Sequence, residues 1–186
     1  MVAYICENAI ELIQDPYGNY AVQEVMDKWS EQDFQPLVNK VKTKVAQLSI
    51  QKFSSNVVEK CLMMSDLQQR GDIILHLAKI DKLVTVMRNS YGNYVVQKAL
   101  YLSNGDVKVA LADAIYENIP VIQDKKIRVK WAQLLQNSIA NDLNFVERYN
   151  FDEYLLDGSM TAAATPGLEL IHQSSSNDSG MDFSLH

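Results

Sequence analysis

A seven-residue segment that occurs twice almost unchanged constrains this chain more than any other feature. Residues 17–23 read YGNYAVQ and residues 91–97 read YGNYVVQ. Between them, residues 53–59 read FSSNVVE, which keeps the order aromatic, small, polar, polar, apolar, valine, polar but changes the polar letters. From Asn19 to Ser55 is 36 residues, and from Ser55 to Asn93 is 38. This spacing is typical of a helical solenoid, in which each unit buries a face against its neighbours.

Apolar residues around each copy fall at helical spacing, so we predict that each unit is a helix, a turn and a second helix. The turn of the first unit is Asp15-Pro16-Tyr17-Gly18, and its second helix is expected from about Asn19. The second unit is expected to begin near Pro36, since proline suits an early helix position. The predicted stripes of the three first helices are Ile5, Ala9, Leu12 and Ile13; Leu37, Val38, Val41, Val45 and Leu48; and Ile73, Leu77, Ile80, Val84 and Met87.

A fourth, degenerate unit follows when the same register is carried on. Its stripe is Leu111, Ile115, Ile119 and Ile122. The positions of Asn19, Tyr20 and Gln23 are taken there by Arg128, Val129 and Ala132. The architecture persists while the polar letters are lost, which indicates a C-terminal cap whose outer face tolerates water.

These patterns divide the chain into a solenoid over residues 1–145 and an acidic, mostly disordered tail over residues 146–186. The units span about 1–35, 36–70 and 71–106, and the cap spans 107–145. Residues 145–156 are expected to pack on the cap. Because the chain opens directly on the first helix of a unit, we expect either a longer solenoid or a second chain over that end.

Charge is unevenly distributed along the chain, whose formal net charge is −6. Residues 1–135 hold 16 Lys and Arg against 15 Asp and Glu, whereas residues 136–186 hold 1 against 8. A protein that binds nucleic acid mainly through phosphates should be clearly basic. If this chain binds RNA, it must therefore depend on the bases.

The sequence also indicates a cytoplasmic protein. It contains no apolar run long enough for a membrane span, and its start lacks the pattern of a signal peptide. Cys6 and Cys61 fall within helical patterns, so we interpret them as buried apolar residues rather than disulfide or metal-binding residues.

Candidate binding chemistry lies at the start of each second helix. Asn19 and Gln23 are four residues apart and share a helix face beside Tyr20. Two amides next to a ring can hold a nucleobase, because the amides meet its edge and the ring meets its face. The same positions in the third unit are Asn93, Tyr94 and Gln97.

In the middle unit the edge positions are Ser55 and Glu59, with Asn56 at the stacking position. A carboxylate is an acceptor only, so Glu59 needs a partner with two donors, which guanine supplies through N1–H and its amino group. Uracil offers one donor between two acceptors, which an Asn with a Gln can satisfy.

Simpler interpretations exist for each residue: Asn19 or Ser55 could be a helix N-cap, and a tyrosine near a turn is often half-buried packing. Joint variation argues against them. Gln23 and Gln97 become Glu59 in the same unit where the Asn becomes Ser55.

At these residues the chain resembles the Pumilio-type (PUF) RNA-binding repeat, which reads one base per helical repeat. The resemblance covers about residues 1–145 and implies an all-α, right-handed solenoid with an armadillo- or HEAT-like superhelix. Order and identity match the last three repeats and the C-terminal cap of that family's domain. The family domain usually has eight repeats, so three alone are expected to bind weakly.

In the family, Asn-Tyr-x-x-Gln reads uracil, Ser-Asn-x-x-Glu reads guanine, and the RNA runs antiparallel to the protein. The resemblance therefore implies recognition of 5′-UGU-3′ in single-stranded RNA. The base edges would be read by Asn93 and Gln97, then Ser55 and Glu59, then Asn19 and Gln23, with Tyr94, Asn56 and Tyr20 as stacking residues. It further implies control of mRNA translation and stability through 3′ untranslated regions, with repressor or deadenylase proteins as partners and no cofactor.

Two other classes of function are alternatives. A protein-binding scaffold of the armadillo or HEAT type would make the triplets incidental. An enzyme is not expected, because the histidines His76, His172 and His186 have no partner at the spacing of a metal site or catalytic triad. His76 is interpreted as a surface residue.

Overall fold

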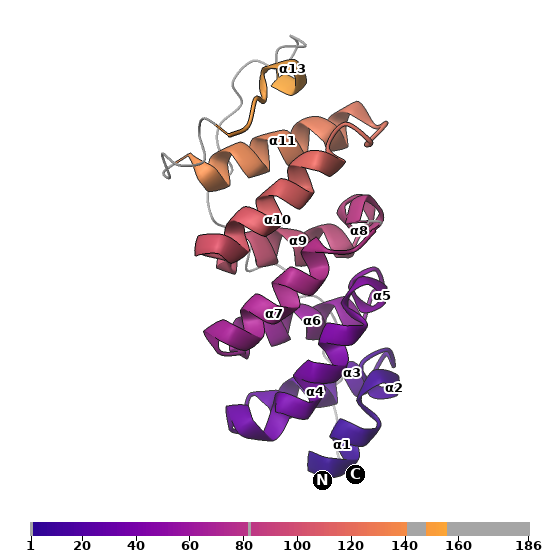
Figure 1. Ribbon diagram of the computed structural model, residues 1–186. Coiled ribbons are helices and arrows are strands. Elements are labelled where there is room, and N and C mark those ends of the chain that lie inside the picture. Colours follow the sequence, from indigo (N-terminus) through magenta and orange to yellow (C-terminus); the bar gives the residue numbers. More distant parts are fainter. Residues whose placement is uncertain (1, 82, 141–147, 156–186) are drawn as a thin grey trace, which may run out of the picture. The chain divides into compact units, whose positions relative to one another are not determined.

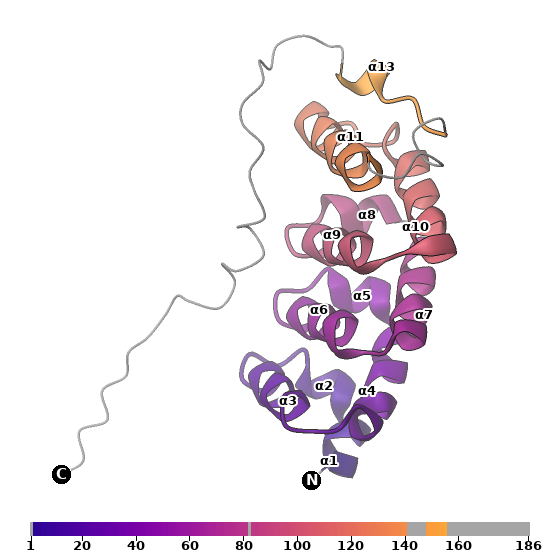
Figure 2. The ribbon, with the colours of Figure 1, turned by 90° about the vertical axis from the view of Figure 1, so that its left-hand side faces the viewer.

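The protein is a stack of helical layers, seen in a computed structural model that describes residues 2–81, 83–140 and 148–155. All regular elements in these ranges are α-helices. Helices of the same kind lie above one another from layer to layer, so α4, α7 and α10 form one column and α3, α6 and α9 another (Figures 1 and 2). Residues 1–156 form one compact unit. Of the predicted tail, residues 146, 147 and 156–186 lie outside those described.

Three successive layers each contain three helices. They are α1 (Val2–Glu7), α2 (Ala9–Leu12) and α3 (Gly18–Met26); α4 (Glu31–Thr43), α5 (Val45–Ser49) and α6 (Ser54–Met64); and α7 (Leu67–Ala78), α8 (Leu83–Arg88) and α9 (Gly92–Leu102). Two long helices follow, α10 (Gly105–Asn118) and α11 (Lys125–Ile139), and then the short helix α13 (Asp152–Leu155).

The prediction of a single first helix in each unit was wrong. In each layer the predicted stripe runs through two helices, which break at Asn8, at Lys44 and between Ala78 and Leu83. The stripe is unaffected because the short helix that follows each break keeps its apolar side on the same core. The start near Pro36 was also wrong. Helix α4 begins five residues earlier, where the main-chain N–H of Ser30 donates to Asp33 at 3.3 Å.

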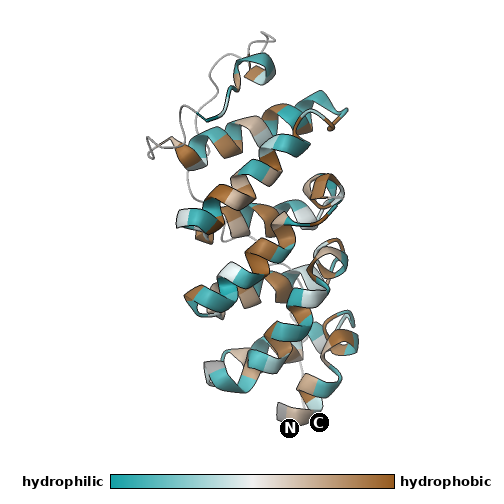
Figure 3. Cartoon of the chain, viewed as in Figure 1, coloured by the Kyte–Doolittle hydropathy of each residue, from teal (hydrophilic) through white to brown (hydrophobic). Residues whose placement is uncertain are grey.

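The apolar core runs continuously through the layers. Every predicted stripe residue of the second unit and of the cap is buried, as are Cys6 and Cys61, which are free thiols. Burial raises the pKa of the Cys61 thiol to about 12. Hydrophobic and hydrophilic residues are interspersed along the helices (Figure 3). This is the pattern of a helix that has one side against the core and the other side in water.

Polar contacts fix neighbouring helices at the edge of this core. Lys60 on α6 pairs with Asp27, just after α3, at 2.5 Å. On α7, Arg70 donates to the main-chain carbonyls of Leu62 at 2.7 Å and Ser65 at 2.8 Å. These carbonyls lie at the end of α6, where a helix has no internal partner for them, so Arg70 stabilises that end.

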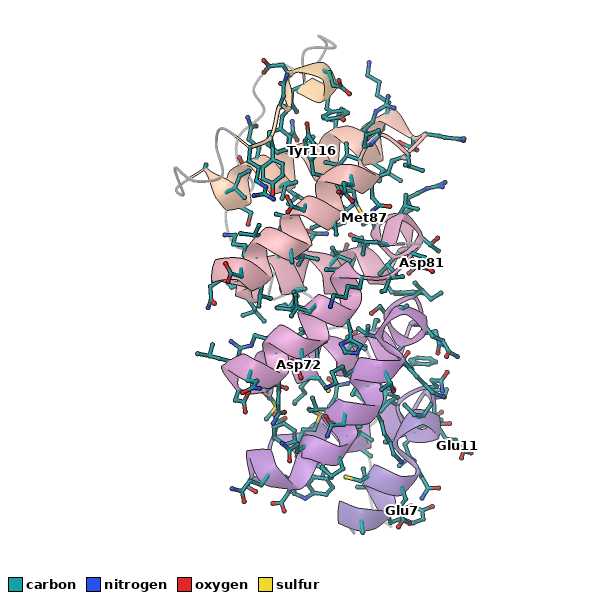
Figure 4. The ribbon with its side chains drawn as sticks, in the orientation of Figure 1. Glu7, Glu11, Asp72, Asp81, Met87 and Tyr116 are labelled. Carbon is teal, nitrogen blue, oxygen red and sulfur yellow. The ribbon has the colours of Figure 1, made fainter. Side chains whose placement is uncertain are left out.

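The last layer is closed as expected by the described part of residues 145–156. Tyr149 and Phe151 are buried against Tyr116 of α10, with ring centroids 5.0 and 5.6 Å away. Arg148 forms two hydrogen bonds with Asp113, at 2.9 and 2.7 Å. In Figure 4, Tyr116 lies beneath this closing segment.

The turns before α3, α6 and α9, the last helix of each layer, require a very close approach of two main-chain segments. A Cβ on Gly18 would lie 2.6 Å from the carbonyl oxygen of Leu12, and one on Gly92 would lie 2.7 Å from that of Val86. The equivalent residue of the middle unit is Ser54, whose hydroxyl donates to the equivalent carbonyl, that of Leu48, at 2.7 Å. Two units therefore exclude a side chain here, and the third accommodates one by turning the contact into a hydrogen bond.

Gly92→Ala should destabilise the fold by about 1 to 3 kcal/mol, because the main chain around α8 must shift to admit the methyl group. Gly71→Ala on α7 is the matched control, since its Cβ would meet only Val107, at 3.4 Å. That change should be neutral or stabilising by up to about 1 kcal/mol, because alanine favours a helix interior. Urea unfolding followed by circular dichroism would measure both. Equal effects of the two variants would contradict the close-approach argument.

Candidate nucleic-acid interface

The predicted triplets come together in one row. Helix α3 packs on α6, α6 on α9, and α9 on α11, and these helices lie one above another on the same side of the molecule (Figure 2). Each triplet occupies the first turns of its helix, which begin at Gly18, Ser54 and Gly92. We call the nine residues the polar row: Asn19, Tyr20, Gln23, Ser55, Asn56, Glu59, Asn93, Tyr94 and Gln97.

The helix starts in the first and third units are capped by residues outside the triplets. The carboxylate of Asp15 accepts from the main-chain N–H groups of Tyr17 and Gly18, at 2.9 and 2.7 Å. Asn89 does the same in the third unit, at 2.8 and 2.9 Å. Asn19 and Asn93 are therefore not needed as N-caps, which was the simpler interpretation of the sequence.

The two asparagines are instead held by main-chain carbonyls. The Nδ2 of Asn19 donates to the carbonyls of Asp15 and Pro16, both at 2.9 Å. The Nδ2 of Asn93 makes the equivalent bonds at 2.9 and 3.1 Å. Both N–H donors of each amide are used, so the orientation of the side chain is fixed and Oδ1 is left as an acceptor.

Each acceptor is met by the glutamine one turn further on. Gln97 donates to Oδ1 of Asn93 at 2.9 Å, and Gln23 donates to Oδ1 of Asn19 at 3.3 Å. Asn19 is fully buried, whereas the other three side chains are half-buried. Because Asn19 is buried and its Oδ1 already accepts from Gln23, a base that used this acceptor would have to displace Gln23 or share Oδ1 with it.

The middle unit places a carboxylate where its neighbours have an amide. Ser55 is buried, and its hydroxyl donates weakly to the carbonyl of Lys52 at 3.4 Å. Burial raises the pKa of the Glu59 carboxyl, an effect that the charge of Lys98 on α9 partly offsets. Glu59 is thus a partly desolvated acid, and hydrogen-bond donors from a ligand would stabilise its charged form.

The stacking positions are far more open than the edge positions. Tyr20 is 66% exposed and Tyr94 is 51% exposed, while Asn56 between them is half-buried. The two rings are therefore not packing residues, which was the other simple interpretation. Covered polar edges beside open rings are the arrangement that a flat, hydrogen-bonding ligand requires.

A residue that the sequence did not single out also lies at this row. Lys130, on α11, places Nζ 3.2 Å from Oδ1 of Asn93 and 5.8 Å from the centre of the Tyr94 ring. Its position in the register, one residue after Val129, was available from the repeat alignment. What the alignment could not show was that the side chain reaches back across to the preceding unit.

Other kinds of site find little support in the described parts of the chain. No three His, Cys, Asp or Glu residues there are grouped so that they could hold a metal ion. No helix among the described residues is long and apolar enough to cross a membrane. His76 is exposed, as expected, and its Nδ1 lies 2.9 Å from the carbonyl oxygen of Asp72.

Comparison with known proteins identifies the repeat. The family model of the Pumilio-family RNA binding repeat matches residues 8–42, 44–78 and 82–116. Among curated relatives, Pumilio homolog 12 of Arabidopsis thaliana is 43% identical over 119 residues, which is 64% of this chain and 20% of that protein. Pumilio homolog 9 of the same plant is 35% identical over 116 residues, 62% and 20% of the two chains. The chain therefore spans about a fifth of the length of these relatives.

Solved structures of PUF proteins are also similar to this chain. PUF-8 in complex with PBE-RNA has a TM-score of 0.66 and 26% identity, covering 74% of this chain and 41% of that one. The Puf3 RNA binding domain bound to a Cox17 RNA 3′ UTR recognition sequence has a TM-score of 0.63 and 25% identity, covering 79% and 44%. With more than half of its residues inside three matched repeats, this chain belongs to the Pumilio family of RNA-binding repeat proteins.

Proposed function

We propose that the polar row binds single-stranded RNA containing 5′-UGU-3′, with one base at each of α9, α6 and α3. The observation that carries this proposal is the row itself: three covered polar edges beside one another, two amide pairs flanking a serine and a carboxylate. Similarity to PUF-8 in complex with PBE-RNA and to the RNA-bound Puf3 domain supports RNA binding by this chain.

The amide pairs suit uracil. Because both N–H donors of Asn93 are held by the main chain, its Oδ1 is the acceptor for the N3–H of the base. Gln97, which donates to Oδ1 in the free protein, can turn its amide to a uracil carbonyl instead. The same exchange at Asn19 and Gln23 explains how a buried acceptor becomes available: the base replaces the internal hydrogen bond.

The carboxylate suits guanine. The N1–H and amino group of guanine lie side by side, and both can donate to Glu59. Uracil would instead bring a carbonyl towards a partly desolvated carboxylate, leaving both acceptors unpaired. The middle unit is therefore proposed to specify the second base.

In the cell, this recognition would act on mRNA. We propose that the chain contributes to post-transcriptional control of translation or stability through UGU elements of 3′ untranslated regions, in the cytoplasm and with repressor or deadenylase partners. Three bases at about 1 to 3 kcal/mol of stacking each must offset an association cost of about 4 to 15 kcal/mol. Further repeats on a longer chain would supply the remaining affinity.

Exchanging the middle edge tests the proposal. Ser55→Asn with Glu59→Gln recreates the flanking amide pair, so preference at the second base should change from G to U, a shift of about 1 to 3 kcal/mol at that position. The measurement is competition binding of UGU and UUU placed in one longer RNA. UCU serves as the control for sequence-independent binding, and also for a protein-binding scaffold that does not discriminate between RNAs.

The first and third bases provide the internal control, because one repeat reads one base. They should still be read as uracil in the double variant. A double variant that continued to prefer UGU would show that Ser55 and Glu59 do not meet the base edge.

Binding of guanine should weaken in acid. Only the charged form of Glu59 accepts two hydrogen bonds, and its pKa in the free protein is raised by burial above the ordinary value of 4.5. Affinity for UGU should therefore be constant at high pH and fall as the pH drops to the raised pKa, before an ordinary glutamate would titrate. Titrations at several pH values with an RNA of only U and G would measure this, with the Ser55→Asn/Glu59→Gln variant on UUU as the flat control.

Removing a stacking ring should lower affinity without changing base preference, since every base has a face to stack. Tyr20→Ala or Tyr94→Ala should cost about 1 to 3 kcal/mol of binding free energy. Tyr101→Ala is the matched control, because Tyr101 is 62% exposed on the same helix as Tyr94 but lies outside the row. A change in preferred base larger than the loss of affinity would refute the stacking role.

A further inference from the structure

Helix α11 carries positive charge where the other units carry reading residues. Its sequence begins Lys125-Lys126-Ile127-Arg128-Val129-Lys130, and residues 125–139 contain four basic and no acidic residues in a chain of net charge −6. The corresponding helices are nearly neutral: α3 contains one acidic residue, and α9 contains one basic residue. In the repeat register, Lys126 replaces Tyr17, Arg128 replaces Asn19, and Lys130 replaces Ala21.

This charge lies at the less favourable end of the helix. The amino terminus of a helix carries partial positive charge, so cations in the first turns are repelled while acids are attracted. The cap needs only apolar residues on its inner side, and these are present as Trp131, Ala132 and Leu135, all buried. Arg128 has a structural role, since its guanidinium donates to the main-chain carbonyl of Ile122 at 3.3 Å. The apolar packing of the cap does not require the charges of Lys126 and Lys130, whereas a bound anion would be stabilised by them.

The orientation of α11 brings Lys130 to the end of the polar row. The indole N–H of Trp131 donates to the carbonyl of Met87 at 3.0 Å, which fixes α11 on the third unit. From the adjacent position, Lys130 reaches Asn93 and the ring of Tyr94. Burial lowers the pKa of the Lys130 ammonium, so its charge is only partly solvated in the free protein.

The residue at the repeat position of Lys130 is different beyond the first unit. Asn19 and Tyr20 are followed in the stack by Val57 of α6, which is buried and apolar. Units one and three carry the same triplet, yet the residue at this register position is apolar beyond the first unit and a cation, Lys130, beyond the third. That side is where the RNA would continue beyond the first uracil.

We infer that Lys126 and Lys130, four residues apart on one face of α11, form a phosphate-binding surface that holds the RNA backbone on the 5′ side of UGU. This rests on the proposed function for the position and direction of the RNA. When the first base stacks on Tyr94, Lys130 leaves the ring and pairs with the phosphate preceding that base. The surface takes a phosphodiester chain and reads no base, because Val129 and Ala132 stand where a stacking and an edge residue would be.

Three RNAs with a common UGU core and 3′ flank test the inference. One begins at the first U, one carries three uridines before it, and one carries three abasic ribose phosphates. Both extensions should tighten binding of the whole chain to the same degree. The slope of log K against log salt should become steeper by about 0.7 for each phosphate that is neutralised.

Lys126→Met with Lys130→Met keeps the aliphatic stems and removes two charges. This double variant should lose the gain and the extra slope from either extension. Lys126→Met alone should lose part of both and bind the core-only RNA as the natural chain does. Lys44→Met with Lys79→Met is the control, because both residues are exposed and lie at junctions between a long and a short helix. It should retain the gain from the extensions. Thermal melts of both variants, and the single variant Lys126→Met, separate loss of contact from loss of fold.

Several outcomes would overturn the inference. Extensions that do not tighten binding, uridines that succeed where abasic phosphates fail, or a Lys126→Met variant that binds the core-only RNA and the extended RNAs with the same loss would each do so. Competition by an acidic peptide as effective as the abasic extension would indicate a protein partner instead. Because all three RNAs share the core, these comparisons can be made whatever the preference for UGU over UCU, which tests the proposed function separately.

Discussion

The rest of the structure depends on one kind of contact, the packing of α3 on α6, of α6 on α9 and of α9 on α11. This packing places Val57, Val58 and Cys61 of α6 in a continuous core between α3 and α9. The same contact sets the distance between successive triplets. A solenoid of this kind converts sequence spacing into spatial spacing, and the proposed ligand, RNA, has bases that repeat at a regular interval.

Within that row, the hydrogen-bonding groups are covered and the rings are open. This division has a physical reason: hydrogen bonds discriminate most strongly where water cannot compete, whereas stacking needs an accessible face. Glu59 shows what the division costs the free protein. Its charge is held partly out of water, which disfavours the folded, ionised state at neutral pH, and the donors of a ligand would compensate for it.

The sequence predicted what depends on periodicity, namely the helical layers, the buried stripes, the position of the triplets and the cap. It could not predict the breaks near Lys44 and after Ala78, because an apolar stripe continues in register across a short break. Nor could it predict that Asn19 would be fully buried or that Lys130 would reach Asn93. These depend on contacts between residues four positions apart in one case and 37 in the other, whose geometry is set by the main chain.

Asn19 and Asn93 each make two hydrogen bonds to the turn before their helix. These residues, which are proposed to read bases, therefore also stabilise the fold. Ser55 makes only one such bond, and a weak one. A repeat with the serine proposed to read guanine therefore ties its edge position to the preceding turn with fewer hydrogen bonds than a repeat with the asparagine proposed to read uracil. Replacing the edge residues of a repeat to alter the base it is proposed to read would therefore also change the local stability of that repeat. In a solenoid with many repeats of one kind, these differences in stability would add up.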